Sequence, residues 1–205
     1  AEVCAAEEGT VLIELASGIA DMGWFETTLG NAIILSHKNE MLTVYGNLDE
    51  VTLQSDIEKV SNEMKLGTSG TSGWQKGKNC LEFQVIDIKS KNLINPFVLM
   101  PVLQNKTELS IKNLVAISSA GKTVPIANYS KINSGIYRLY IKKQVAGMTY
   151  RTSVLVNGAV AENLTFDILS QKDNRLVVKG KNSYSFEEIY PDAENQLLAE
   201  VILSK

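Results

Sequence analysis

Short runs of apolar residues alternate with polar residues along almost the whole chain, and turn-forming residues separate the runs. Alternation with a period of two residues is typical of β-strands that bury one face. Such runs occur at residues 9–15, 31–37, 41–48, 81–88, 135–143, 153–158, 164–169, 175–180 and 197–204. The pattern therefore predicts an all-β protein.

One stretch departs from this pattern, SDIEKVSNEMKL at residues 55–66. The spacing of Ile57, Val60 and Met64 fits one face of a helix. No glycine suited to end a helix occurs before Gly67. The stretch predicts either a short helix or an irregular loop.

The chain is predicted to divide into two domains near its middle. Pro96 and Pro101 end an apolar run, and the polar sequence QNKTE at residues 104–108 follows as a linker. Beyond the linker come about seven or eight short strands in about 100 residues, a density typical of β-sandwiches. We therefore expect a β-sheet domain at residues 1–103 and an immunoglobulin-like β-sandwich at residues 109–205.

Charge and composition exclude several classes of function. The 205 residues carry a formal net charge of −3, whereas nucleic-acid-binding proteins usually show a basic patch. No stretch approaches the roughly 18 consecutive apolar residues of a membrane-spanning helix. His37 is the only histidine, so a mechanism that needs two imidazoles is nearly excluded for these residues.

Two segments of the first half carry the candidate chemistry. In NCLEFQVID, residues 79–87, Leu81 and Phe83 are expected on the buried face of a strand. The opposite face would carry a thiol, a carboxylate and an amide, those of Cys80, Glu82 and Gln84. The glycine-rich segment GTSGTSGWQKGK, residues 67–78, has no phosphate-binding motif and predicts a long mobile loop beside a strand.

Residues 3–103 resemble the LytM-type, M23 family of peptidoglycan metallopeptidases. Five segments follow the order of that family's motifs, including a strand pair V-x-A-x-x-x-G-x-V, a T-x-Y-x-H-L strand and an H-L-H-F-E strand. The matching segments are VCAAEEGTV (3–11), LGNAIILSHKNEMLTVYGNL (29–48), LGTSGTSG (66–73), CLEFQV (80–85) and INPFVLM (94–100). The resemblance implies an M23-like β-sheet fold for the first domain.

The residues at the family's catalytic positions differ in this chain. Cys80 replaces the first histidine of H-x-H, Glu82 stands at the position of a zinc ligand, and Asn47 replaces the histidine of Y-x-H-L. The other zinc-binding motif, H-x-G-x-D, is expected to precede residue 1. His37 matches a position that binds no metal in the family, and we expect it to be a partly buried packing residue. The resemblance therefore predicts a domain that is not an enzyme and has no cofactor.

The resemblance also outlines a degenerate groove that could bind a ligand. Its expected residues are Tyr45, Asn47, Trp74, Cys80 and Glu82. The same register turns Cys4 and Cys80 toward this groove, which permits a disulfide between them or two separate buried thiols. Trp74 lies in the loop beside the groove, and Trp24 lies in a second turn; each could anchor a partner or pack on its own loop.

By resemblance, we expect a non-enzymatic binding or regulatory module located in the periplasm or at the cell surface. Its partner would be peptidoglycan or another protein, such as a cell-wall hydrolase. The alternatives are a structural protein of an envelope complex, or a zinc metallopeptidase whose first metal ligands precede residue 1. The sequence does not specify an oligomeric state.

Overall fold

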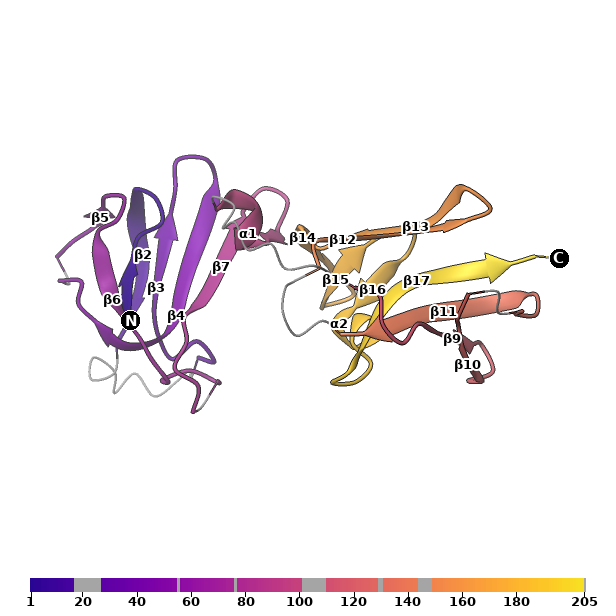
Figure 1. Ribbon diagram of the computed structural model, residues 1–205. Helices are drawn as coiled ribbons and strands as arrows, with labels where there is room; N and C mark the ends of the chain where they lie inside the picture. Colours follow the sequence, from indigo (N-terminus) through magenta and orange to yellow (C-terminus); the bar gives the residue numbers. More distant parts are fainter. Residues whose placement is uncertain are drawn as a thin grey trace. The chain divides into compact units, whose positions relative to one another are not determined.

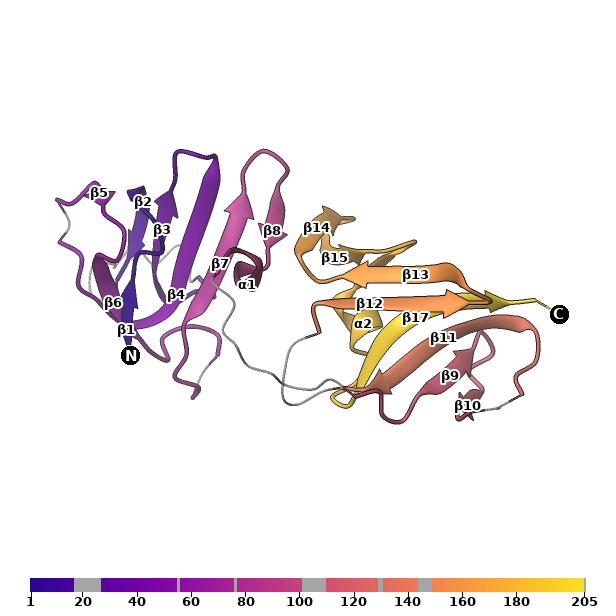
Figure 2. The same ribbon diagram turned by 45° about the horizontal axis from the view of Figure 1, so that its top comes forward.

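The computed structural model describes residues 1–16, 27–54, 56–75, 77–100, 110–128, 131–143 and 149–204. Within these ranges the chain forms seventeen β-strands and two short helices (Figures 1 and 2). The all-β prediction is confirmed. The chain separates into two compact units, Ala1–Leu99 and Met100–Lys205, called here the first and second units. The predicted linker at residues 104–108 lies outside the described residues.

The first unit is built on an antiparallel sheet with the strand order β5-β2-β3-β4-β7-β8. A two-stranded layer, β1 and β6, joins this sheet because β6 also pairs with the end of β4. The elements are β1 (Glu2–Cys4), β2 (Gly9–Leu15), β3 (Asn31–Ser36), β4 (Met41–Val51), β5 (Lys59–Val60), β6 (Lys65–Ser69), β7 (Glu82–Asp87), β8 (Asn92–Ile94) and α1 (Pro96–Leu99).

One hydrophobic core fills the first unit. Its buried side chains come from β1, β3, β4, β5 and β6 and from the segments beside them: Val3, Ala5, Ile33, Leu35, Tyr45, Leu48, Leu53, Val60 and Leu66. Ile33 and Leu35 face this core from β3, as the period of two predicts. The core residues of β4, Tyr45 and Leu48, are three positions apart, and Asn47 between them has a left-handed φ of 61°. His37 is buried at the end of β3, where Nδ1 bonds to the Glu8 carbonyl at 2.8 Å and Nε2 to Thr43 Oγ1 at 2.8 Å. It is a packing residue, as expected.

The stretch at residues 55–66 forms no helix in its described part. It is irregular, with strand β5 in the middle and the start of β6 at its end. Val60 is buried in the core, and Ile57 and Met64 pack against it. The helical spacing of these three side chains therefore reflects a loop that touches the core at intervals, in agreement with the second of the two expectations.

The second unit is a β-sandwich, as predicted. A four-stranded sheet with the order β10-β9-β11-β17 packs against the hairpin of β12 and β13, and β14, β15 and β16 form a further antiparallel group. The elements are β9 (Val115–Ser118), β10 (Thr123–Pro125), β11 (Gly135–Lys142), β12 (Arg151–Val156), β13 (Ala159–Thr165), β14 (Ile168–Lys172), β15 (Arg175–Lys179), β16 (Ser183–Ser185), α2 (Phe186–Ile189) and β17 (Asn195–Leu203).

Candidate functional site

The candidate site lies where β7 begins beside the end of β4. Glu82 is paired with Gly46, and Phe83 with Tyr45. Neighbouring side chains of a strand point to opposite faces, so Glu82 and Gln84 share the outer face. Phe83 faces the core, where its ring lies 5.1 Å from that of Tyr45.

Tyr45 does not line this outer face, so its predicted place in the groove is wrong. The side chain is 1% exposed, and its hydroxyl accepts a hydrogen bond of 2.9 Å from the main-chain N–H of Ala6. The prediction that Leu81 is buried is also wrong, because this residue is 37% exposed. Strand β7 begins only at Glu82, so the alternation that buries Phe83 does not extend back to Leu81.

Asn47 is fully buried at the centre of the site. Its Nδ2 donates hydrogen bonds to the carbonyls of Gly70 at 2.6 Å and Cys80 at 2.8 Å. Its Oδ1 accepts one of 2.8 Å from the N–H of Gly73. The backbone has φ of 61°, a left-handed conformation that asparagine adopts more readily than most residues. The side-chain amide therefore anchors the loop that follows β6 through its hydrogen bonds.

The glycine-rich loop after β6 is anchored, in contrast to the mobile loop that its composition predicts. A Cβ at Gly70 would lie 2.0 Å from the Asp49 carboxylate, which also accepts a hydrogen bond of 3.0 Å from the Thr71 N–H. The Ser72 hydroxyl accepts one of 3.0 Å from the N–H of Asn31. Glycine thus allows the loop backbone to approach the end of β4 closely.

The outer face of β7 carries a connected polar group, the Glu82 cluster, formed by Trp74, Gln75, Cys80, Glu82 and Gln84. Glu82 Oε2 accepts hydrogen bonds from the Trp74 indole at 2.8 Å and from Gln75 at 3.4 Å. Glu82 Oε1 accepts one of 2.7 Å from Gln84. The Cys80 thiol donates to the side-chain oxygen of Gln75. Both carboxylate oxygens are therefore already bonded to N–H donors.

These residues do not fit a zinc ion. A zinc site needs several nitrogen, sulfur or carboxylate ligands that converge on one point. The groups that converge on Glu82 are instead the N–H donors of an indole and two amides, which point where a cation would lie. Throughout the described ranges, no three His, Cys, Asp or Glu side chains are grouped so that they could hold a metal.

The disulfide between Cys4 and Cys80 is not formed, because both residues are free thiols. The main chain of Cys4 is paired with that of Lys65 at the start of β6. The main chain of Cys80 is paired with that of Gly70, in an isolated antiparallel β-bridge just beyond the other end of β6. Five residues of extended chain span about 16 Å. A disulfide needs Cα atoms no more than about 7 Å apart. The strand register therefore separates the two thiols.

Four of the five predicted groove residues come together: Asn47, Trp74, Cys80 and Glu82. Two further members of the Glu82 cluster, Gln75 and Gln84, were missing from that set. Gln84 could have been included, because it lies two residues after Glu82 on the same strand face. Nothing in the sequence indicates that Gln75 lies beside Cys80. Trp24 falls outside the described residues.

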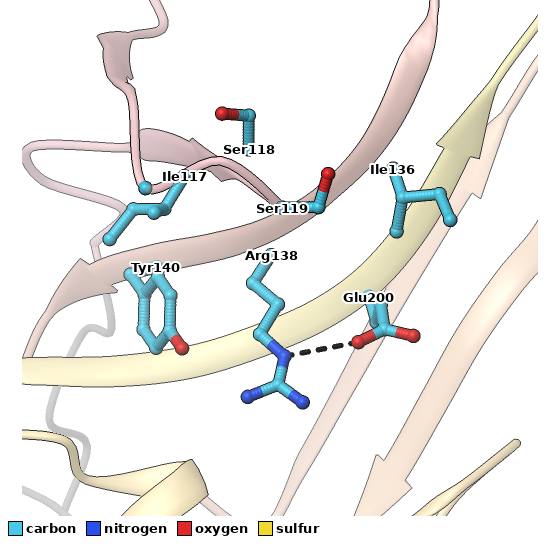
Figure 3. A pocket seen from close by; sticks show the side chains of 8 residues that line it. Ile117, Ser118, Ser119, Ile136, Arg138, Tyr140 and Glu200 are labelled. Carbon is cyan, nitrogen blue, oxygen red and sulfur yellow. Dashed lines mark hydrogen bonds and ion pairs between the residues drawn. The ribbon is translucent and has the colours of Figure 1, made fainter.

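The second unit has a separate pocket of about 360 Å³ above β9, β11 and β17 (Figure 3). Arg138 projects across it, and its Nε donates to Glu200 at 3.0 Å. Its Nη2 donates to Glu188 at 3.1 Å. The guanidinium charge is thus balanced by two carboxylates, which makes the pocket a poor site for an anion. We place the candidate site on the first unit for this reason.

The first unit is thus an antiparallel β-sheet domain with a buried amide and an exposed polar cluster where β7 begins. Residues 1–96 match the family model described as peptidase family M23, so this unit is an M23-like domain, as the sequence resemblance predicted. Residues 108–205 match a second family model, which has no functional description. A search of curated proteins finds no significant match. Among the described residues, no helix has the length and apolar character required to cross a membrane.

Proposed function

We propose that the M23-like domain is a non-enzymatic binding or regulatory module of the cell envelope, with peptidoglycan or a cell-wall hydrolase as its partner. The observation that carries this proposal is that the Asn47 side chain is buried and fully hydrogen-bonded to the main chain. It stands at a position where the family has an imidazole, and its amide is consumed by hydrogen bonds to Gly70, Gly73 and Cys80.

The chemistry of the substituted positions supports the absence of peptidase activity. An amide neither accepts nor releases a proton near neutral pH, so Asn47 cannot serve as a general acid or base. Glu82 is surrounded by N–H donors, and both of its oxygens are engaged. Cys80 has a carboxylate two residues away instead of an imidazole that would activate its thiol.

The same face of the first unit can still bind a partner through the exposed side chain of Trp74. Trp74 is 64% exposed, although its indole N–H is bonded to Glu82. An exposed and oriented indole is typical of anchor residues in binding surfaces. We therefore expect contact with the partner on the surface around Trp74, because Asn47 and Tyr45 are buried beneath it.

The proposal is tested with the purified chain and insoluble peptidoglycan. We expect the chain to sediment with peptidoglycan, or to activate or inhibit a cell-wall hydrolase added to it, and to release no muropeptides by itself. Zinc content is measured on the same sample by elemental analysis. Muropeptide release by the chain alone, together with one bound zinc per chain, would overturn the proposal.

A structural role in an envelope complex is the second candidate function. It is favoured by the position of the loop at residues 70–80, which covers Asn47 and fills part of the expected groove. A chain that has neither peptidoglycan binding nor any effect on hydrolases, and that is recovered in a stable envelope complex, would support this role over the first.

A further inference from the structure

We propose that the Glu82 cluster is a carbohydrate-binding surface, on which Trp74 stacks against a sugar ring of an N-acetylated glycan chain. This inference rests on the proposed function and specifies its ligand: the glycan strand of the cell wall and not its peptide. Within the cluster, the side chains proposed to contact the sugar are those of Trp74, Gln75, Glu82 and Gln84, which belong to one loop and to strand β7.

The indole of Trp74 is held in a fixed orientation before any ligand arrives. Its main-chain N–H donates to the Thr28 carbonyl at 2.9 Å, and its Nε1 donates to Glu82 Oε2 at 2.8 Å. Gln84 in turn holds the other oxygen of Glu82 at 2.7 Å. An anchored side chain loses little conformational entropy on binding, yet this one is 64% exposed. Such a ring is suited to stacking.

The chemistry beside the indole favours a sugar over an apolar protein surface. The face of an aromatic ring carries partial negative charge and attracts the C–H groups on the apolar face of a pyranose. The Trp74 indole is bonded to the carboxylate of Glu82, which also accepts from the carboxamides of Gln75 and Gln84. A carboxylate and two carboxamides can exchange hydrogen bonds with the hydroxyl and N-acetyl groups of a sugar. Gln75 and Gln84 each retain further donor or acceptor capacity after bonding to Glu82.

Apart from Leu81, which is 37% exposed beside Glu82, the exposed aliphatic side chains of the first unit lie away from the Glu82 cluster. Leu12 and Ile13 belong to β2, and Phe97 and Leu99 belong to α1. Among the described residues, the side chains hydrogen-bonded to or through Glu82 are all polar apart from the indole itself. A protein-binding hot spot is usually ringed by contacts that exclude water, whereas this surface consists of hydrogen-bonding groups.

The experiment is a calorimetric titration of the full chain with the tetrasaccharide of β-1,4-linked N-acetylglucosamine. We expect binding by the unaltered chain and a loss of at least about tenfold in affinity for Trp74→Ala. Trp74→Phe retains a stacking ring and should recover part of the affinity. Phe97→Ala is the matched control, because Phe97 is also an exposed aromatic residue of the first unit at 62%, and it should bind as the unaltered chain does.

Peptidoglycan sedimentation and hydrolase assays with the same variants separate this inference from the proposed function. No binding of the tetrasaccharide, or equal binding by Trp74→Ala, overturns the carbohydrate surface even if the chain still binds peptidoglycan. Loss of hydrolase binding in Trp74→Ala without any sugar binding also overturns it and assigns the surface to a protein partner. Failure of the unaltered chain in all three assays would refute the proposed function as well.

Discussion

The side-chain amide of Asn47 donates a hydrogen bond of 2.8 Å to the main-chain carbonyl of Cys80, 33 residues further along the chain. The sequence resemblance predicts both residues at positions where the M23 motifs have histidines. Here they connect the end of β4 to the segment that leads into β7, with the loop between them held in place. Asn47 and Cys80 thus form a structural link between two segments of the first unit.

Replacement of Asn47 by alanine should destabilise the first unit by about 3 kcal/mol. The substitution removes the acceptor of the buried Gly73 N–H and places an alanine in a left-handed conformation. Urea unfolding monitored by tryptophan fluorescence measures this change, because both tryptophans, Trp24 and Trp74, belong to the first unit.

Asn39→Ala is the control for this variant, since Asn39 is exposed in the turn between β3 and β4. Its free energy of unfolding should stay within about 0.5 kcal/mol of that of the unaltered protein. An Asn47→Ala protein as stable as this control would contradict the structural role of the buried amide.

Gly67→Ala should destabilise the first unit by about 3 kcal/mol or more, because a Cβ at this residue would lie 2.2 Å from the main-chain oxygen of Glu50. Relief would require movement of the paired strands. Gly77→Ala is the comparison: it has no atom within 4 Å of the added Cβ and a φ of 84°, so strain alone should cost about 1 kcal/mol. Equal unfolding midpoints for the two variants would argue against the close packing at Gly67.

Both cysteines should be alkylated without prior reduction once the protein is denatured. The register of β6 keeps Cys4 and Cys80 apart, and both are free thiols. Mass spectrometry after treatment with iodoacetamide in urea should show two added carbamidomethyl groups per chain. A proteolytic fragment that contains Cys4 joined to Cys80 would contradict this strand register.

Glu162→Gln should destabilise the second unit by about 2 kcal/mol. The carboxylate is 2% exposed and accepts hydrogen bonds from the N–H of Asn163, the N–H of Lys181 and the hydroxyl of Tyr184. A glutamine would turn an NH₂ group toward at least one of these donors. Circular dichroism during urea unfolding measures the effect, and the exposed Glu194→Gln should be nearly neutral.

The stability of the first unit should fall in alkaline solution. Burial raises the pKa of Tyr45, so the unfolded chain loses this proton at a lower pH than the folded chain does. The stabilisation is present below the unfolded pKa of about 10 and is lost as the pH rises above it, by up to about 1.4 kcal/mol per pH unit. Urea midpoints read by tryptophan fluorescence at about pH 9 and pH 11 should differ less in Tyr45→Phe than in the unaltered protein. The same difference in both would contradict this assignment.

The sequence predicted the strand content, the M23-like fold and the β-sandwich, because each depends on local alternation or on motifs that can be read along the chain. It also identified Asn47, Cys80, Glu82 and Trp74 as neighbours through the family register. It did not predict that Tyr45 faces the core, because alternation separates two faces of a strand without saying which face another layer covers. The layer formed by β1 and β6 decides this in the structure.

What the sequence alone determined is therefore the set of chemical groups at the positions that the family resemblance singles out: an amide, a thiol and a carboxylate. Only the tertiary structure decided how these groups are used. The amide of Asn47 is buried because the glycine-rich loop folds back against β4, and the carboxylate of Glu82 orients an exposed indole. The partners of Asn47 lie 23 to 33 residues further along the chain, and such long-range hydrogen bonds depend on strand pairing and loop closure, which no local pattern specifies. The partners of Glu82 lie within eight residues of it, and the closure of the same loop brings Trp74 and Gln75 to its carboxylate.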